Sequence, residues 1–501
     1  MKVLSLMLIF LTVSGYSYVL QPRLTVAQVA ELERDQSDMT SEQLGDVSLS
    51  VEEEEKAGEL TEEGKTGGKK MGGGLTPETN SERRMAPDDE TSQKSDQMDQ
   101  LKQEKVEEEI QQKSVTCQPQ QSFLVLFYCL KIFLLRVVQC SDKGVDKVPY
   151  GIPYNSRYIL LMNNHIDVIQ LDLLNEYVSM EFLVLSNNRL KDETIEGAFE
   201  GIPALKRLYL NTNLLISVPA DLPMSLEELR LDNNHLIVMS EAAWARCPGL
   251  LILSLSNNSL GNGSECLPNA VLSPLSSLRT LNLDHNQLTS VPLGLPLSIK
   301  QLYLKGNLIE QFRGGAFNGR SELMVLDLSS NRLTNKGLLK DSLLNATHLE
   351  SLNLEGNRLK QVPQHLPSSL KTLNLEGNLI SSIKKMVFGT LKNLENLGLA
   401  RNKIFKVAPG AFKTLPVLHQ LDLCHNTLRQ VPRQLPKALH SLALTHNKIQ
   451  TVPRDAFCWG NQSYSLSGLV RVQLEHNLID MGKLDAQAFR CLRGFQVVHF
   501  Y

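Results

Sequence analysis

The stretch Leu205-Lys-Arg-Leu208-Tyr-Leu210-Asn-Thr-Asn213-Leu-Leu215 contains the pattern that decides the fold of this chain. Apolar residues stand at positions 1, 4, 6 and 11 of the pattern, and asparagine stands at position 9. The pattern runs fourteen times from about Ser156 to Ile479, with Ile, Val or Met replacing Leu at some positions. The position-9 residues are Asn164, Asn188, Asn213, Asn234, Asn258, Asn286, Asn307, Asn331, Asn357, Asn378, Asn402, Asn426, Asn447 and Asn477.

The spacing of these asparagines indicates a repeat architecture. Successive gaps are 24, 25, 21, 24, 28, 21, 24, 26, 21, 24, 24, 21 and 30 residues, which is typical of units made of one strand and a return segment. One unit cannot bury its own apolar side chains, so neighbouring units must stack and share a continuous core. The sequence therefore predicts an α/β leucine-rich-repeat solenoid. We expect a curved parallel sheet on its concave face and a mostly irregular convex side with short helical turns.

The repeated asparagine has a structural explanation. Its amide both donates and accepts hydrogen bonds, so it can satisfy the backbone groups that each turn would leave unpaired. Because buried polar groups are nearly always paired, we interpret the fourteen asparagines as a scaffold ladder and not as ligand contacts.

The ends of the chain predict export. A basic residue at position 2, an apolar run at 3–13 and small residues beyond it are typical of a secretory signal. No later apolar run approaches the roughly 20 residues of a membrane-spanning helix, so we expect a secreted protein without a membrane anchor. The expected organisation is a signal peptide at 1–17, an acidic disordered arm at 18–116, a cysteine-containing N-terminal cap at 117–155, leucine-rich repeats at 156–457, and a disulfide-bracketed terminal repeat and cap at 458–501.

An apolar stretch at residues 123–135 has two interpretations. It is too short to span a bilayer. It fits either a buried strand of the N-terminal cap or an inserted segment that disturbs the cap, and both interpretations stay open.

The eight cysteines favour disulfides over metal binding in an exported chain. Cys458 and Cys491 bracket the longest repeat, where a bond would clamp the uncovered end of the stack. Cys247 and Cys266 fall in the return segments of adjoining repeats and are expected to bond to each other.

The remaining cysteines divide between the N-terminal cap and the sheet. Cys117, Cys129 and Cys140 precede the first repeat, and we expect Cys117 and Cys140 to take part in disulfides of the cap. Three cysteines leave one to pair elsewhere or to stay free, so the connectivity stays open. Cys424 stands at position 7 of its repeat and is interpreted as a small apolar filler.

Four Asn-x-Ser/Thr triplets agree with an extracellular compartment. The expected N-glycosylation sites are Asn257, Asn262, Asn345 and Asn461. Asn345 and Asn461 lie outside the strand motif, where a glycan would project freely.

Together these features resemble the small leucine-rich proteoglycans of the extracellular matrix. The resemblance covers roughly residues 117–501 and includes 21-residue repeats with the segment VPxxLPxSL, as in Val218–Leu226. The segment LRVVQCSD at 135–142 resembles the end of the cap in decorin- and biglycan-type members, and residues 458–491 resemble their elongated "ear" repeat. Fourteen motifs resemble the longer, podocan-type members.

The resemblance implies a matrix organiser. Members of this family bind collagen fibrils and growth factors, so collagen or another matrix protein is the expected partner. A soluble growth-factor trap or signalling co-receptor is the alternative. Altered collagen fibrils would favour the first function, and tight one-to-one binding of a folded ligand would favour the second. Net charge of −3 gives no reason to expect nucleic acid as a partner.

The repeat geometry predicts where a partner binds. Positions 3, 5 and 7 form three columns on the concave sheet that we expect to be exposed to solvent. A homodimer formed through paired concave faces also fits this geometry. The candidate partner-binding residues are Arg207, Tyr209, Glu228, Arg230, Asp232, Tyr303, Lys305, Asp327, Glu355 and Glu376.

An enzymatic function finds no support in the motifs. The histidines are scattered, and the acids Glu355 and Glu376 recur because the repeats recur. Since no nucleophile, base and orienting group are brought together by a recognisable pattern, we expect no catalytic residues, no cofactor and no metal.

Overall fold

The structure is a computed structural model, and it describes most of the chain from residue 136 onward. The described residues are 136–237, 239, 241–261, 270–312, 315–319, 321–338, 343, 345–458, 466–494 and 497–500, together with the backbone of Val115–Thr116. The chain divides into two units, Met1–Ser114 and Val115–Tyr501. All that follows concerns the second unit. The expected signal peptide, nearly all of the acidic arm, and the apolar stretch 123–135 lie outside the described residues.

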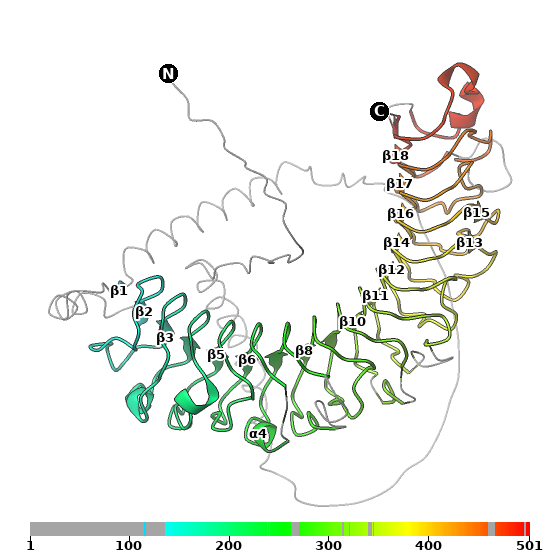
Figure 1. The fold of residues 1–501 in the computed structure, drawn as a ribbon. Coiled ribbons are helices and arrows are strands. Elements are labelled where there is room, and N and C mark those ends of the chain that lie inside the picture. Colours follow the sequence, from blue (N-terminus) through cyan, green and yellow to red (C-terminus); the bar gives the residue numbers. More distant parts are fainter. Residues whose placement is uncertain are drawn as a thin grey trace, which may run out of the picture. The chain divides into compact units, whose positions relative to one another are not determined.

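Parallel strands form the backbone of the solenoid. Within the described residues they make one 17-stranded sheet, in which each strand pairs in parallel with the strand of the next repeat. Figure 1 shows these strands along the inner side of a curved stack. The strands are Val115–Thr116 (β1), Val137–Gln139 (β2), Tyr158–Leu160 (β3), Phe182–Val184 (β4), Arg207–Tyr209 (β5), Glu228–Arg230 (β6), Ile252–Ser254 (β7), Thr280–Asn282 (β8), Gln301–Tyr303 (β9), Val325–Asp327 (β10), Ser351–Asn353 (β11), Thr372–Asn374 (β12), Asn396–Gly398 (β14), Gln420–Asp422 (β16), Ser441–Ala443 (β17), Arg471–Gln473 (β18) and Val498–His499 (β19).

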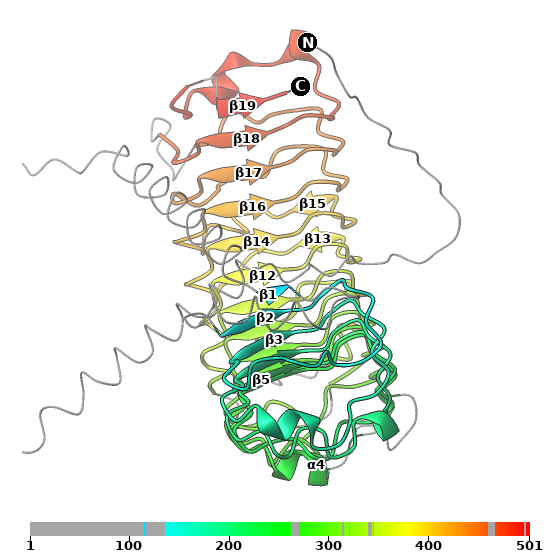
Figure 2. The ribbon, with the colours of Figure 1, turned by 90° about the vertical axis from the view of Figure 1, so that its left-hand side faces the viewer.

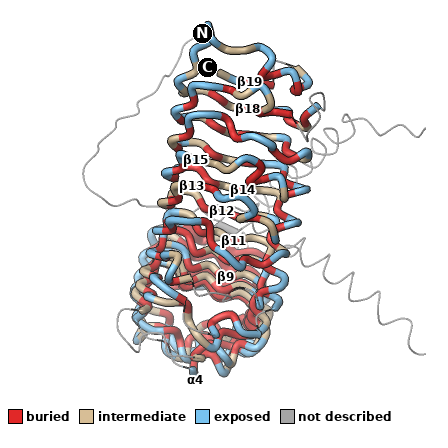
Figure 3. Tube along the Cα trace, turned by 90° about the vertical axis from the view of Figure 1, so that its right-hand side faces the viewer, coloured by how far each residue is buried: buried red, intermediate tan, exposed pale blue. Residues whose placement is uncertain are grey.

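The leucines of the motif set the register and fill the core. Position-4 residues pair with one another across the sheet, as in Leu326 with Leu352 and Leu352 with Leu373. Their side chains are buried, and Figure 3 shows buried residues running through successive turns of the stack. Burying one leucine side chain stabilises a protein by roughly 1.5–3 kcal/mol, so the repeated register contributes stability at every turn.

The asparagine ladder has the scaffold role predicted for it. Asn378 is buried, and its amide donates to the carbonyl oxygens of Leu354 at 2.8 Å and Leu375 at 3.1 Å. Its Oδ1 accepts the backbone N–H of Leu359 in the preceding repeat at 3.0 Å. Each asparagine therefore connects its own turn with the turn before it, and Figure 2 shows the resulting stack of rungs.

The convex side contains little helix, which confirms the predicted fold class. Among the described residues the helices are the α-helix Glu241–Ala245 (α4) and the 3₁₀ helices Leu173–Glu176 (η1), Asp192–Thr194 (η2), Met481–Lys483 (η3) and Ala486–Phe489 (η4). A second, two-stranded sheet pairs Ser382–Ile383 (β13) with Lys406–Val407 (β15). Return segments of different lengths therefore adopt different local structures around one constant sheet.

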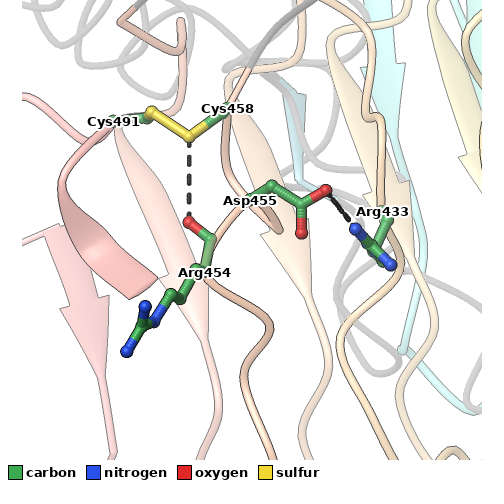
Figure 4. The surroundings of a disulfide bond; sticks show 5 residues. All are labelled: Arg433, Arg454, Asp455, Cys458 and Cys491. Atoms are coloured by element: carbon green, nitrogen blue, oxygen red, sulfur yellow. Dashed lines mark hydrogen bonds and ion pairs between the residues drawn. A yellow bond between two sulfur atoms is a disulfide. The ribbon is translucent and has the colours of Figure 1, made fainter. Parts of the chain in front are cut away.

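The C-terminal end is closed by the disulfide between Cys458 and Cys491, which are 33 residues apart (Figure 4). Beside this bond the rings of Phe457 and Phe489 stack with centroids 5.8 Å apart. Arg433 forms an ion pair with Asp455 in the same region (Figure 4). The bond and the rings together close the apolar end of the last repeat.

The other cysteines depart from expectation at one place. Cys247 is a buried free thiol whose Sγ donates to the carbonyl oxygen of Pro223 at 3.6 Å, so the expected bond to Cys266 is wrong for this structure. Cys266 lies outside the described residues. The thiol instead fills a core position in the return segment, and burial raises its pKa to about 11. Cys140 is disulfide-bonded to a partner outside the described residues.

Candidate binding surface on the concave sheet

The concave sheet changes character along its length. In the first two repeats, positions 3, 5 and 7 carry apolar and aromatic side chains, with the exception of Ser186. Tyr158 contacts Phe182 with ring centroids 6.3 Å apart, and Phe182 contacts Tyr209 at 4.8 Å, both edge to face. Tyr158 and Phe182 occupy paired positions on β3 and β4, whereas Tyr209 on β5 pairs with Val184 and meets Phe182 diagonally. This part of the surface is an aromatic row.

Three of the candidate partner-binding residues are buried, contrary to the expectation that all ten would be exposed. Tyr209, Glu228 and Asp232 are only 3%, 4% and 5% exposed. The physical reason is lateral contact between rungs, because each of these side chains packs against or hydrogen-bonds to a neighbour on the sheet. These three side chains therefore hold neighbouring side chains in place and are not themselves exposed to a partner.

Glu228 is the centre of a charged network. Its carboxylate accepts a hydrogen bond from the Tyr209 hydroxyl at 2.8 Å and from Arg230 Nε at 2.6 Å, while Arg207 Nε lies 3.7 Å away. The Arg230 guanidinium also lies 4.9 Å from the centroid of the Tyr209 ring. Burial, followed by the Glu228 charge, raises the pKa of Tyr209 far above its ordinary value, so its hydroxyl stays protonated and donates. Two arginines held by one buried carboxylate leave part of their positive charge facing the concave side.

Asp232 has a different set of partners. Its Oδ1 accepts hydrogen bonds from the Ser254 hydroxyl at 2.5 Å, from the Ser256 hydroxyl at 2.6 Å and from the Ser256 backbone N–H at 2.8 Å. The carboxylate is therefore satisfied within the sheet by the following repeat. It joins β6 to β7 and leaves little capacity for a ligand.

The central part of the concave sheet is acidic. From β8 to β16, positions 3, 5 and 7 carry five carboxylates and one lysine. The other residues at these positions are uncharged. The carboxylates are half-buried and the lysine, Lys305, is exposed. We call this surface the acidic centre, and its carboxylates belong to Asp284, Asp327, Glu355, Glu376 and Asp422.

Asparagines at position 5 orient two of these acids. Asn353 donates to Asp327 Oδ2 at 3.1 Å, and Asn374 donates to Glu355 Oε2 at 3.1 Å. Each amide also accepts a backbone N–H on its own strand, from Glu355 and Glu376 respectively. Asp327 Oδ1 also accepts the backbone N–H of Ser329 at 2.8 Å. Asp327 and Glu355 are therefore held in place across β10, β11 and β12.

Asp284 is the most perturbed of the acids. Its pKa is raised from 3.8 to about 6. Burial is the largest cause and the Asp327 charge adds to it, while the Lys305 backbone N–H and ammonium act in the opposite direction. The N–H of Lys305 lies 2.6 Å from Asp284 Oδ1. The pKa of Glu376 is also raised, by burial and then by Glu355. A cationic partner would therefore reduce the repulsion among these clustered, half-buried carboxylates.

The remaining candidates of the acidic centre lie where the motif placed them. Tyr303 is half-buried on β9, and its hydroxyl lies 3.4 Å from Gln301 Oε1. Glu376 forms an ion pair with Arg401 at 3.4 Å. Cys424 is a half-buried free thiol whose pKa is raised to about 11, with burial as the largest cause, in agreement with a filler role.

A column of histidines lies at the sheet edge and was not among the predicted site residues. His425, His446 and His476 stand at position 8 of successive repeats, and their rings contact one another. The sequence contains a signal for this column, because three consecutive repeats have histidine at position 8.

Two of the four expected glycosylation sites lie among the described residues. Asn345 is exposed, and its amide donates to Asn318 Oδ1 at 3.1 Å. Asn257 is exposed at position 8, with a positive φ of 51° and a hydrogen bond to Asn233. Asn262 and Asn461 lie outside the described residues.

Two features are absent from the described residues. None of their helices combines the length and the apolar character that crossing a membrane requires. In the same part of the chain, no group of three or more His, Cys, Asp or Glu side chains is arranged to hold a metal ion.

Comparisons with known proteins agree with this architecture. A leucine-rich-repeat family model matches residues 224–288, 298–359, 347–404 and 368–428. The chain is 34% identical to keratocan of Danio rerio over 229 residues, which are 46% of this chain and 65% of keratocan. It is 32% identical to lumican of Homo sapiens over 257 residues, which are 50% of this chain and 71% of lumican. Its alignment thus spans slightly less than two thirds of keratocan and slightly more than two thirds of human lumican.

A solved structure supports the fold alone. A leucine-rich-repeat protein of Leptospira interrogans is similar with a TM-score of 0.55 and 24% identity, covering 73% of this chain and 95% of that one. The repeat geometry, the closed C-terminal end and the identity to keratocan and lumican lead to one assignment: the chain belongs to the small leucine-rich proteoglycans of the extracellular matrix.

Proposed function

We propose that this chain is a secreted matrix protein that binds collagen through the acidic centre of its concave sheet and organises fibril assembly without catalysis. The observation that carries the proposal is a group of half-buried carboxylates in three successive repeats, Asp327 on β10 and Glu355 and Glu376 just after β11 and β12. Asn353 and Asn374 hold the first two in place. Its membership of a matrix family supports the choice of a matrix partner.

This arrangement suits a long and straight ligand. Adjacent strands lie about 4.8 Å apart, so Glu355 and Glu376, which share motif position 7, repeat at that interval, and Asp327 lies at position 5 of the repeat before them. A collagen triple helix presents its X and Y side chains, lysine and arginine among them, along a rigid rod. Because the carboxylates are half-buried, their attraction for such cations is less screened than on an open surface.

Cationic side chains beside and within the acidic centre offer a second kind of contact. Arg230 is partly exposed beside the aromatic ring of Tyr209, and Lys305 is exposed within the acidic centre. Acidic side chains of the same triple helix would meet these cations. Alternating charge along the ligand would then fix its register on the sheet.

The test is a collagen fibril assembly assay with a charge-removing variant, Asp327→Asn, Glu355→Gln and Glu376→Gln. We expect wild-type protein to co-sediment with fibrils and change their diameter, and the variant to lose most of this effect. The asparagine and glutamine side chains keep the size of the acids and one accepting oxygen, so the fold should be kept. Circular dichroism and thermal unfolding check this.

A control variant of equal charge change is available on the return segments. Glu196, Glu241 and Glu322 are exposed, and Glu241 lies in α4 on the outer side of the stack (Figure 1). Their replacement by glutamine should leave fibril binding intact. Equal loss in both variants would refute the concave site, and fibrils unaffected by wild-type protein would refute the collagen function.

The same assay distinguishes collagen binding from the growth-factor alternative. A trap or co-receptor would bind a folded ligand one to one and leave fibrils unchanged. Sedimentation equilibrium of the protein alone measures the proposed pairing of concave faces into a homodimer, which the concave charge variant would also alter.

A further inference from the structure

A column of stacked imidazoles marks the C-terminal part of the solenoid. His425, His446 and His476 are exposed, and the ring centroids of adjacent pairs are 4.2 Å apart. The three residues follow β16, β17 and β18, which are stacked in Figure 1. We call them the imidazole column.

The backbone does not require histidine at these positions. Position 8 adopts a left-handed conformation, with φ values of 52°, 53° and 55° at the three histidines. Asparagine and glycine adopt this conformation readily. Asn163 and Asn187 fill the same position in early repeats, and Gly356 fills it in the middle. The ionisable rings therefore need an explanation beyond the fold.

Permanent cations continue the column on the same edge. Arg401 is the position-8 residue of the preceding repeat, and its N–H donates to the carbonyl of Cys424 at 2.9 Å. Lys403 and Lys448 stand at position 10, and Arg429 stands at position 12. All four are exposed. Together with the imidazole column they form a surface that we call the basic edge.

Most of this charge is free. Among the described residues, Lys403, Arg429 and Lys448 form no ion pair, and Arg401 is paired only with Glu376 at 3.4 Å while its side chain remains 67% exposed. The basic edge therefore presents a row of cations that are available to an external anion.

Two carboxylates interact with the imidazole column, Glu376 with His425 and Glu475 with His446, and Asp422 interacts with Glu376. Glu376 follows β12 and is engaged by Arg401, while Asp422 on β16 accepts the N–H of Cys424 at 2.8 Å. The pKa of His446 is lowered, by partial loss of hydration and by the adjacent His425 and His476, against the opposite effect of Glu475, which follows β18. Protonating the column therefore places like charges close together, and a bound polyanion would relieve their repulsion.

We propose that the basic edge binds a linear sulfated polysaccharide, and that this binding tightens as the pH falls. Strands about 4.8 Å apart place the cations in a regular row, which a linear chain can contact at several points at once. Sulfate esters stay ionised at acid pH, so the ligand keeps its charge while the imidazoles gain theirs. The choice of polysaccharide over other polyanions rests on the matrix location proposed above.

The experiment measures heparin binding to the full-length protein by anisotropy at about pH 8 and about pH 5, at one fixed ionic strength. We expect affinity at the lower pH to be about tenfold higher, the effect of one unit of coupled pKa shift. Replacing His425, His446 and His476 by asparagine should abolish this gain and keep the affinity at pH 8. Asparagine suits the left-handed backbone, so this variant should fold.

A second variant removes the permanent cations. Replacing Lys403, Arg429 and Lys448 by glutamine should reduce affinity at both pH values by more than tenfold. Its matched control replaces the exposed Lys300, Lys392 and Lys413, which lie away from this edge, and should bind as wild type does.

Several outcomes would overturn the proposal. Equal loss of heparin affinity in the variant without the permanent cations and in its lysine control would refute the location of the site. A pH gain that persists in the histidine variant would refute the role of the imidazole column. Desulfated heparin or duplex DNA of similar length binding as tightly as heparin would refute the sulfated ligand. The collagen assay should be unchanged by every basic-edge variant, so failure of one proposal does not imply failure of the other.

Discussion

Replacing Asp284 by asparagine should stabilise the folded protein at neutral and alkaline pH. The pKa of this carboxyl is raised from 3.8 to about 6, with burial as the largest cause and Asp327 as a further one. At 1.36 kcal/mol for each pKa unit, the shift corresponds to about 3 kcal/mol of destabilisation once the group is ionised. Because Asp284 is only half-buried, solvent screening reduces this to about 1–2 kcal/mol.

The sign follows from proton binding. Between about pH 4 and about pH 6 the folded state holds the Asp284 proton while the unfolded state has released it. Stability contributed by this group therefore falls as the pH rises through that window, and stays low above it. The asparagine variant lacks this loss, and its side-chain oxygen can still accept the Lys305 N–H.

Urea unfolding of both proteins across this pH range measures the effect. We expect the variant to be about 1–2 kcal/mol more stable at about pH 8 and equal to wild type near pH 4. Asp167, which is exposed, provides a control substitution to asparagine that should change neither value. A variant that is less stable at pH 8, or that retains the full pH dependence of wild type, would show that burial does not disfavour the charge.

Further substitutions test the ends, the ladder and the buried network. Replacing Cys458 and Cys491 by serine removes a 33-residue loop closure, and calorimetry should show a loss of about 3–4 kcal/mol; unchanged stability would contradict the clamping role. Asn378→Ala should cost about 2–4 kcal/mol in chemical unfolding because buried backbone groups in two repeats lose their partner. Glu228→Gln should cost about 3 kcal/mol and lower the pKa of Tyr209, measured by ultraviolet titration; a mild effect on both would mean that the network is dispensable.

The repeat architecture could be predicted because its signal is local and recurs fourteen times. Each Leu-x-x-Leu-x-Leu-x-x-Asn segment carries the same side-chain pattern, and the strands and the asparagine ladder follow it directly. The bond between Cys458 and Cys491 was expected for a similar reason, since the two residues bracket a single long repeat.

Burial on the concave sheet could not be predicted from the motif. The motif assigns Tyr209, Glu228 and Asp232 to columns that face outward, yet each is covered by contacts with residues about 20 positions away in sequence. Which side chains meet across rungs depends on their sizes and charges together, and not on position alone. The aromatic row at Tyr158 and Phe182 was the available warning, because large rings on adjacent strands pack against each other.

Cys247 illustrates a different limit. Its spacing from Cys266 suits a bond between neighbouring return segments, but a cysteine is also small and apolar enough to occupy a core position as a free thiol. Sequence spacing does not distinguish these two roles. The three-dimensional surroundings do, since the Cys247 thiol is buried and donates to the Pro223 carbonyl.

The solenoid separates opposite charges because successive motif positions face different directions. Positions 5 and 7 face the concave side, where the acidic centre gathers Asp327, Glu355 and Glu376, while positions 8, 10 and 12 turn onto the edge that carries Lys403 and Lys448. One residue of displacement along the chain thus changes the surface to which a side chain belongs. Because the repeats stack, equivalent positions line up in a row. A few charged residues at one position therefore create an extended charged surface without altering the leucines that hold the repeats together. A cationic rod and an anionic chain could then bind the same domain at once, each on a surface of the opposite sign.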